Sequence, residues 1–109
     1  MYIVQPPNDI IALDAVTGRP FWTYSYNPSL QARPCCGRLN RGVAIHGDRL
    51  FMGTIDGHMV AVDAKTGKLL WDKTVVRPEA GYAFASAPLV VKDKVIMGPA
   101  GGEFGIRGF

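Results

Sequence analysis

The 109-residue sequence lacks the features of several common protein classes. It contains no run of about 18 apolar residues, so no membrane-spanning helix is predicted. Its 12 basic and 9 acidic side chains leave a net charge of +3, which is too small and too scattered for a nucleic-acid-binding surface. The two histidines have no second ligand at metal-binding spacing. The two cysteines are adjacent, and without a Cys-x-x-Cys-His sequence no c-type haem is expected to attach.

What the sequence does contain is an internal repeat. Residues 12–22 read ALDAVTGRPFW, and residues 61–71 read AVDAKTGKLLW. The shared pattern Ala-x-Asp-Ala-x-Thr-Gly-x-x-x-Trp is too long to recur by chance in a chain of this length. A period of about 45–50 residues is typical of a propeller blade of four short strands, and it is too long for ankyrin or tetratricopeptide repeats. The repeat therefore predicts an all-β fold of stacked blades.

Turn residues and alternating apolar residues divide the chain into four parts. Residues 42–76 are expected to form one complete blade, residues 1–26 the end of a preceding blade, and residues 77–109 a loop and the start of a following blade. Residues 27–41 form a long loop with both cysteines, and loops of this length commonly carry function. Because a propeller buries its core only by closing a ring, two blades' worth of strand predicts an internal piece of a longer protein.

The tryptophans that end the two repeats, Trp22 and Trp71, are predicted to be structural. The Asp and Thr residues around each glycine turn can hydrogen-bond the turn backbone. A small Ala at the start of each repeat leaves room for an indole from a neighbouring unit. We therefore expect the two indoles to dock between blades.

The adjacent Cys35 and Cys36 leave two interpretations open. A bond between neighbouring cysteines is strained, because Cα atoms across a trans peptide lie only ~3.8 Å apart. Strain of this kind tends to be kept where it shapes a site. The alternative is a pair of reduced thiols, or thiols bonded to separate partners.

Three features in order resemble the quinoprotein alcohol dehydrogenases. They are the tryptophan repeats, the run CCGRLNRG at residues 35–42 and the run GGEFGIRGF at residues 101–109. The resemblance covers essentially the whole chain. It implies a fragment of an eight-bladed β-propeller with tryptophan-docking repeats, which binds pyrroloquinoline quinone together with Ca²⁺ or a lanthanide. It also implies that the parent protein oxidises an alcohol and passes two reducing equivalents to the quinone.

The resemblance also implies roles for individual residues. Cys35 and Cys36 would form a vicinal disulfide that stacks on one face of the quinone, and Arg41 would present its guanidinium to a cofactor carboxylate. Glu103 stands at the position of the family's metal-ligating glutamate, and carboxylate oxygens are the ligands that Ca²⁺ prefers. Arg38, which lies between these positions, is interpreted as a solvated surface residue.

Other positions concern the floor of the expected site. Gly101 and Gly102 would let the backbone approach the quinone, since no Cβ stands in the way, and the chain after them is expected to be extended. Many relatives carry hydroxyl side chains where this sequence has Ala85 and Ala100, so two hydrogen bonds of roughly 0.5–1.5 kcal/mol each are expected to be missing. The family's aspartate base lies outside these residues. No catalytic residue is therefore expected here, and the isolated fragment is predicted to be inactive.

The resemblance finally implies partners and a compartment. A small alcohol, an electron acceptor such as a cytochrome c or a quinone, and the rest of the propeller are the expected partners. A disulfide requires an oxidising compartment, which indicates the periplasm, with a signal peptide upstream of these residues. Two alternatives stay open: a non-enzymatic propeller scaffold with the same repeats, and a pyrroloquinoline quinone-dependent sugar dehydrogenase. The adjacent cysteines favour the alcohol branch.

Overall fold

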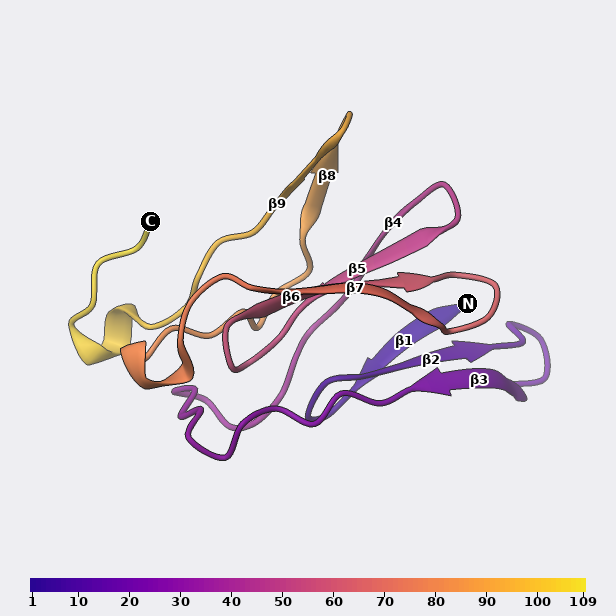
Figure 1. The fold of residues 1–109 in the computed structure, drawn as a ribbon. Helices are drawn as coiled ribbons and strands as arrows, with labels where there is room; N and C mark the ends of the chain where they lie inside the picture. The colour runs from indigo at the N-terminus through magenta and orange to yellow at the C-terminus, as the bar shows by residue number, and fades with distance from the viewer.

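The computed structural model describes all residues from Met1 to Phe109, and it consists of antiparallel strands and loops (Figure 1). The only helical elements are two short 3-10 helices, η1 (Pro78–Ala80) and η2 (Gly102–Phe104). Neither has the length or the apolar composition needed to cross a bilayer. The prediction of an all-β fold is confirmed.

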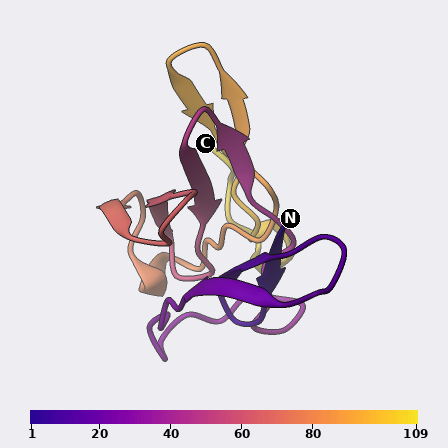
Figure 2. The ribbon, with the colours of Figure 1, turned by 90° about the vertical axis from the view of Figure 1, so that its right-hand side faces the viewer.

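The strands form three separate sheets, and in each sheet neighbouring strands follow one another along the chain. The first sheet contains β1 (Tyr2–Gln5), β2 (Asp9–Leu13) and β3 (Pro20–Tyr24); the second contains β4 (Ala44–His46), β5 (Arg49–Gly53), β6 (His58–Asp63) and β7 (Leu69–Thr74); the third is the hairpin of β8 (Leu89–Val91) and β9 (Lys94–Ile96). In Figures 1 and 2 the β8–β9 hairpin projects away from the first sheet, and the sheets do not close into a ring.

The first two sheets repeat one structural unit. Ala12 pairs with Trp22 in the first sheet and Ala61 pairs with Trp71 in the second, and in both the register shifts directly after the alanine. In each unit the turn aspartate accepts two backbone N–H groups. The turn glycine takes a φ of +73° in the first unit and +74° in the second, which is the left-handed conformation that glycine adopts without a Cβ penalty. The sequence repeat is therefore a repeat of backbone geometry.

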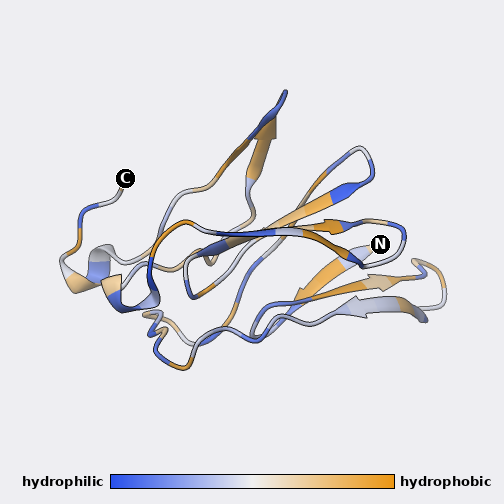
Figure 3. Ribbon diagram, viewed as in Figure 1, coloured by the Kyte–Doolittle hydropathy of each residue, from blue (hydrophilic) through white to orange (hydrophobic).

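The hydrophobic core joins these two sheets. Its fully or nearly buried members are Ile10, Leu50, Met52, Val60, Val62 and Ala64. Trp22 packs against this cluster, and a Cβ placed on Gly67 would lie only 2.5 Å from Cε3 of Trp22. The indole of the first unit therefore rests on the turn glycine of the second, as the docking prediction requires. Figure 3 shows hydrophobic residues along β1, β5 and β8.

Candidate functional site

The long loops gather at one end of the sheets. In Figure 1 the loop after β3 lies near η1 and η2, at the end opposite the β2–β3 and β6–β7 turns. Ala83 and Ala100 pair as an isolated antiparallel bridge, with N···O distances of 3.1 and 2.8 Å. This bridge ties the segment before η2 to the segment after η1. The backbone N–H of Arg41 donates to the carbonyl of Ala85 at 3.0 Å, which brings the cysteine loop to the same place.

A cavity of about 100 Å³ lies between these loops. Four of the predicted site residues line it: Cys35, Cys36, Arg41 and Glu103. The rest of the lining is Pro34, Gly37, Leu39, Ala83, Ala85 and Ala100. The fold thus brings together side chains that lie more than sixty positions apart in the sequence, as Cys35 and Glu103 do (separation 68).

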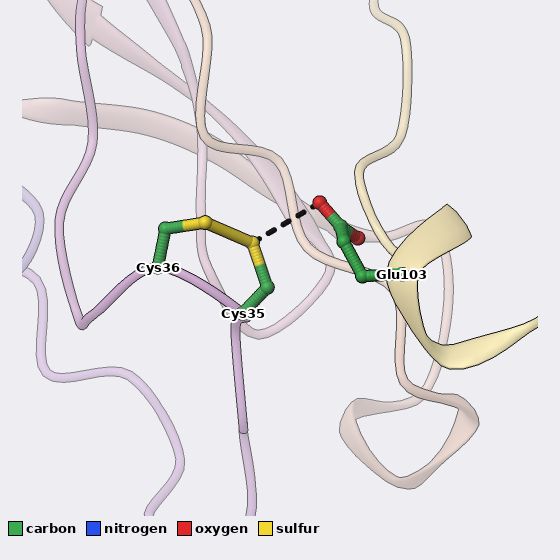
Figure 4. The surroundings of a disulfide bond; sticks show 3 residues. All are labelled: Cys35, Cys36 and Glu103. Atoms are coloured by element: carbon green, nitrogen blue, oxygen red, sulfur yellow. Dashed lines mark hydrogen bonds between the residues drawn. A yellow bond between two sulfur atoms is a disulfide. The ribbon is translucent and has the colours of Figure 1, made fainter.

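Cys35 and Cys36 form a vicinal disulfide, with their Cα atoms 3.8 Å apart. Oε1 of Glu103 lies 3.1 Å from Sγ of Cys35, the pair joined by the dashed line in Figure 4. A sulfur in a disulfide carries no hydrogen, so this is a van der Waals contact and not a donated hydrogen bond. Glu103 is the one acidic side chain in the cavity lining. Its oxygens are therefore the only hard anionic ligands that the cavity offers to a cation.

Arg41 is fixed through its backbone while its guanidinium stays free. The neighbouring Asn40 is buried, and its side-chain amide donates to the carbonyls of Gly53 and Phe84. Asn40 therefore pins this part of the loop to the second sheet. The guanidinium of Arg41 has no hydrogen bond or ion-pair partner in the chain. A free planar cation on a cavity wall can bind a carboxylate through paired charge-assisted hydrogen bonds.

Gly101 and Gly102 do not line the cavity. Gly101 is buried with a φ of +140°, and a Cβ there would lie 2.5 Å from Cδ1 of Ile106 and 2.8 Å from the carbonyl oxygen of Gly81. The close approach that Gly101 allows is therefore to the chain itself. Gly102 begins η2, so the expectation of extended chain after the glycine pair is wrong. The turn of η2 is what aims Glu103 at the disulfide.

Two charged residues, Asp56 and Arg38, hold the cysteine loop, and the sequence predicts this role for neither of them. The carboxylate of Asp56 is buried and accepts from the Tyr26 hydroxyl at 3.1 and 3.2 Å, from the Ser29 N–H at 2.8 Å and from the Thr54 hydroxyl at 2.5 Å. Burial, and then the negative charge of Asp56, raise the pKa of Tyr26 far above its ordinary value, so this hydroxyl stays a donor. Arg38 is not merely solvated, because its guanidinium donates to three backbone carbonyls.

No sequence pattern marked these two residues. Asp56 lies in an Asp-Gly hairpin turn, which explains its presence without any long-range partner. The partners of Arg38 are backbone carbonyls, which every residue carries. Only the folded loop shows that these groups converge.

Comparisons with known proteins agree with this geometry. A family model, PQQ_2, described as "Outer membrane protein assembly factor BamB", matches residues 1–107. The chain is 43% identical over 108 residues to the quinoprotein alcohol dehydrogenase PedH of Pseudomonas putida. This alignment covers 99% of the chain and 18% of PedH. The chain is 40% identical over 112 residues to a 1-butanol dehydrogenase (cytochrome c) of Thauera butanivorans, and this alignment covers 100% of the chain and 16% of that protein. It is 45% identical over 107 residues to a lanthanide-dependent methanol dehydrogenase of Methylacidiphilum fumariolicum, covering 94% and 17%.

Solved structures give the same grouping. A europium-containing methanol dehydrogenase superposes with a TM-score of 0.89 and 42% identity, over 99% of this chain and 20% of that one. The quinohemoprotein alcohol dehydrogenase of Comamonas testosteroni gives a TM-score of 0.85 and 35% identity, over 99% and 17%. BamB from Moraxella catarrhalis superposes with a TM-score of 0.67 and 18% identity, over 98% of this chain and 35% of that one. It shares the fold alone. The chain spans less than a fifth of the curated relatives it matches.

Proposed function

The chain belongs to the PQQ_2 family and, within it, to the quinoprotein alcohol dehydrogenases, and from this premise we propose that it forms one wall of a pyrroloquinoline quinone site in an enzyme that oxidises an alcohol. The observation that carries the proposal is the shared cavity of the Cys35–Cys36 disulfide, Arg41 and Glu103. A structural repeat alone has no need for a disulfide, a free guanidinium and a free carboxylate at one place.

The chemistry of the lining residues fits this cofactor. When bound, the quinone supplies a two-electron acceptor, and its metal ion supplies a Lewis acid. Arg41 would hold a carboxylate of the quinone, the disulfide would cover one face of its ring, and Glu103 would hold Ca²⁺ or a lanthanide. The cavity of about 100 Å³ is smaller than the ~300 Å³ at which small-molecule sites begin, so these residues form one side of a larger site.

These residues position and neutralise charge, and they leave the proton chemistry to other parts of the protein. Besides Glu103, no side chain in the cavity lining can act as a base near neutral pH. A glutamate engaged with a cation cannot also accept the proton of an alcohol efficiently. We therefore infer that the catalytic base comes from outside the chain and that the isolated chain is inactive.

The expected surroundings follow from the same proposal. An alcohol is the substrate class named for the relatives, and the cytochrome c named for the Thauera butanivorans protein makes a cytochrome c, or else a quinone, the acceptor we propose. We place the protein in the periplasm, because an oxidising compartment preserves an exposed vicinal disulfide. The description of the matching family model and the BamB structure both raise a scaffold role as the alternative. We disfavour it because that structure shares only the fold and because a scaffold has no need for the disulfide, Arg41 and Glu103 at one cavity.

The test is a quinone titration of the full-length protein with Ca²⁺ or La³⁺, followed by absorbance and by alcohol-dependent reduction of a dye. We expect Arg41→Ala and Glu103→Gln each to weaken quinone binding about tenfold or more, the effect of losing one hydrogen bond to a charged group. Glu103→Gln should also raise the metal concentration required. Two exposed residues without side-chain partners serve as matched controls, Arg33→Ala and Glu79→Gln, which should bind normally. A full-length protein that binds no quinone would refute the proposal.

A further inference from the structure

The segment that carries the disulfide is not held by its own backbone. Apart from a single turn at Cys35–Cys36, no backbone hydrogen bond ties residues 33–36 to a strand or to any other segment of the chain. The two cysteines in this segment are exposed. A peptide segment of this kind samples many conformations unless side chains restrain it. Some other group must therefore keep the disulfide at the cavity.

Arg38 closes this segment. Its Nη1 donates to the carbonyl of Ala32 at 3.0 Å, and its Nη2 donates to the carbonyls of Pro28 and Ser29 at 3.1 and 3.2 Å. The link from Arg38 to Ala32 spans residues 32–38, with the cysteine pair in the middle. A planar guanidinium can donate to three carbonyls in one fork, whereas a lysine ammonium offers a single point of attachment.

The carbonyls that Arg38 binds belong to a fixed part of the loop. Pro28 and Ala32 are buried, and the N–H of Ser29 donates to Asp56 at 2.8 Å. Asp56 is itself buried in the turn between β5 and β6. A continuous set of hydrogen bonds therefore runs from the second sheet through Ser29 to Arg38, and from there to the disulfide segment.

We propose that Arg38 is a positioning residue for the disulfide. By closing residues 32–38 it keeps the sulfur of Cys35 against the carboxylate of Glu103 and so sets one wall of the cavity. Arg38 does not itself line the cavity, so it acts only through the loop. The proposal deepens the function proposed above and rests on it for the identity of the bound quinone, but the placement of the disulfide can be tested without that quinone.

The first test measures how fast dithiothreitol reduces the disulfide in the full-length oxidised protein, by alkylation and mass counting of Cys35 and Cys36. The Glu103 carboxylate shields one side of the bond from an anionic thiolate, so a loosened loop should react faster. We expect Arg38→Ala and Arg38→Lys to speed reduction about tenfold or more, since hydrogen bonds to a charged group are lost. Arg33→Ala, an exposed arginine of the same loop without a partner, should react at the wild-type rate.

Chemical rescue separates positioning from general stability. Millimolar guanidinium ion should return Arg38→Ala toward the wild-type reduction rate, while the urea midpoint of the sheets stays unchanged in all three variants. If Arg38→Ala fails to fold, Arg38→Lys keeps the charge and the stem and carries the test. Wild-type reduction rates in both Arg38 variants would overturn the proposal.

The second test titrates the same proteins with pyrroloquinoline quinone. We expect Arg38→Ala to bind it about tenfold more weakly, with Arg33→Ala unaffected. A wild-type protein that binds no quinone would overturn the proposed function and leave the result of the reduction test standing. If Arg38→Ala speeds disulfide reduction but leaves the quinone affinity unchanged, the proposal that disulfide placement controls quinone binding would be overturned.

Discussion

The two repeats contain equivalent aromatic pairs in nearly the same geometry, but the pairs have different neighbours. The ring centroids of Tyr2 and Trp22 are 5.9 Å apart with planes inclined at 40°, and those of Phe51 and Trp71 are 5.9 Å apart at 43°. Trp22 rests on Gly67 of the next unit and packs against the core. Trp71 instead lines a cavity of about 580 Å³ between the β4–β5 and β8–β9 hairpins.

This difference separates the features that one repeat forms by itself from the packing that requires a neighbouring repeat. The turn and the aromatic pair need only the residues of one unit, and both units have them. Docking of the indole needs the glycine turn of a following unit, which in this chain only Trp22 contacts. How much each tryptophan contributes to the free energy of unfolding therefore depends on whether a neighbouring unit packs against its indole, more than on the repeat that contains it.

The largest test of the comparison replaces each tryptophan in turn. Trp22→Ala should lower the free energy of unfolding by about 3–5 kcal/mol, because a large side chain is lost from a packed interface. Trp71→Ala should cost roughly 1–2 kcal/mol, because one side of its indole faces a cavity. Urea denaturation followed by the fluorescence of the remaining tryptophan measures both. Equal losses would show that the two environments do not differ energetically.

A second test uses the two turn glycines, which share a φ of +73° or +74°. An alanine at either position suffers the same backbone strain, about 1–2 kcal/mol. At Gly18 the new Cβ meets nothing within 4 Å, whereas at Gly67 it meets Trp22. Gly67→Ala should therefore lose about 1–3 kcal/mol more than Gly18→Ala, as overpacked sites do. Since the backbone term cancels, the difference in unfolding free energy isolates the docked indole.

The features that the sequence predicts well are the local ones. The Asp-Ala-x-Thr-Gly turn and the docking of Trp22 follow from a repeat whose two copies confirm one another. The all-β prediction is correct for the same reason, because alternation and turn residues act over a few positions. The exception is η2, whose single turn lies after Gly101 where extended chain was expected.

The features that escaped prediction depend on long-range contacts. Asn40, buried against the carbonyl of Gly53, and Asp56, buried beneath the cysteine loop, are polar residues whose partners lie on other elements. Arg38 looked like a surface residue because backbone carbonyls leave no trace in a sequence. Cys35, Arg41 and Glu103 were assigned through a family resemblance, and the structure shows that they share a cavity, while their roles stay predictions.

A smaller test concerns a hydroxyl that only the first aromatic pair has. The Tyr2 hydroxyl donates to the carbonyl of Ala64 in the next unit at 2.8 Å, while the equivalent residue of the second repeat is Phe51. Tyr2→Phe should cost about 0.5–1.5 kcal/mol of unfolding free energy, the net value of one hydrogen bond. Tyr24→Phe is the matched control, since the Tyr24 hydroxyl has no partner in the structure. A loss of the same size in both would contradict a specific inter-unit bond.

The smallest test asks whether the turns differ at all. Backbone N–H groups, chiefly that of Thr17 for Asp14 and that of Thr66 for Asp63, hold the pKa of each carboxyl below its ordinary value of 3.8. A carboxyl with a lowered folded pKa stabilises the fold fully at pH values above the ordinary pKa. That contribution is lost as the pH falls below 3.8 and through the folded pKa.

Asp14→Asn and Asp63→Asn should each therefore flatten the dependence of unfolding free energy on pH in the acid range, because asparagine does not titrate. We expect the larger change for Asp63→Asn, because Asp63 also accepts from the Thr66 hydroxyl at 3.0 Å, a third hydrogen bond that Asp14 does not have. Urea denaturation at several pH values below neutrality provides the measurement, with the unaltered protein as the reference. Equal changes in the two variants would show that the hydroxyl bond of Thr66 adds nothing to the backbone hydrogen bonds that the two turns share.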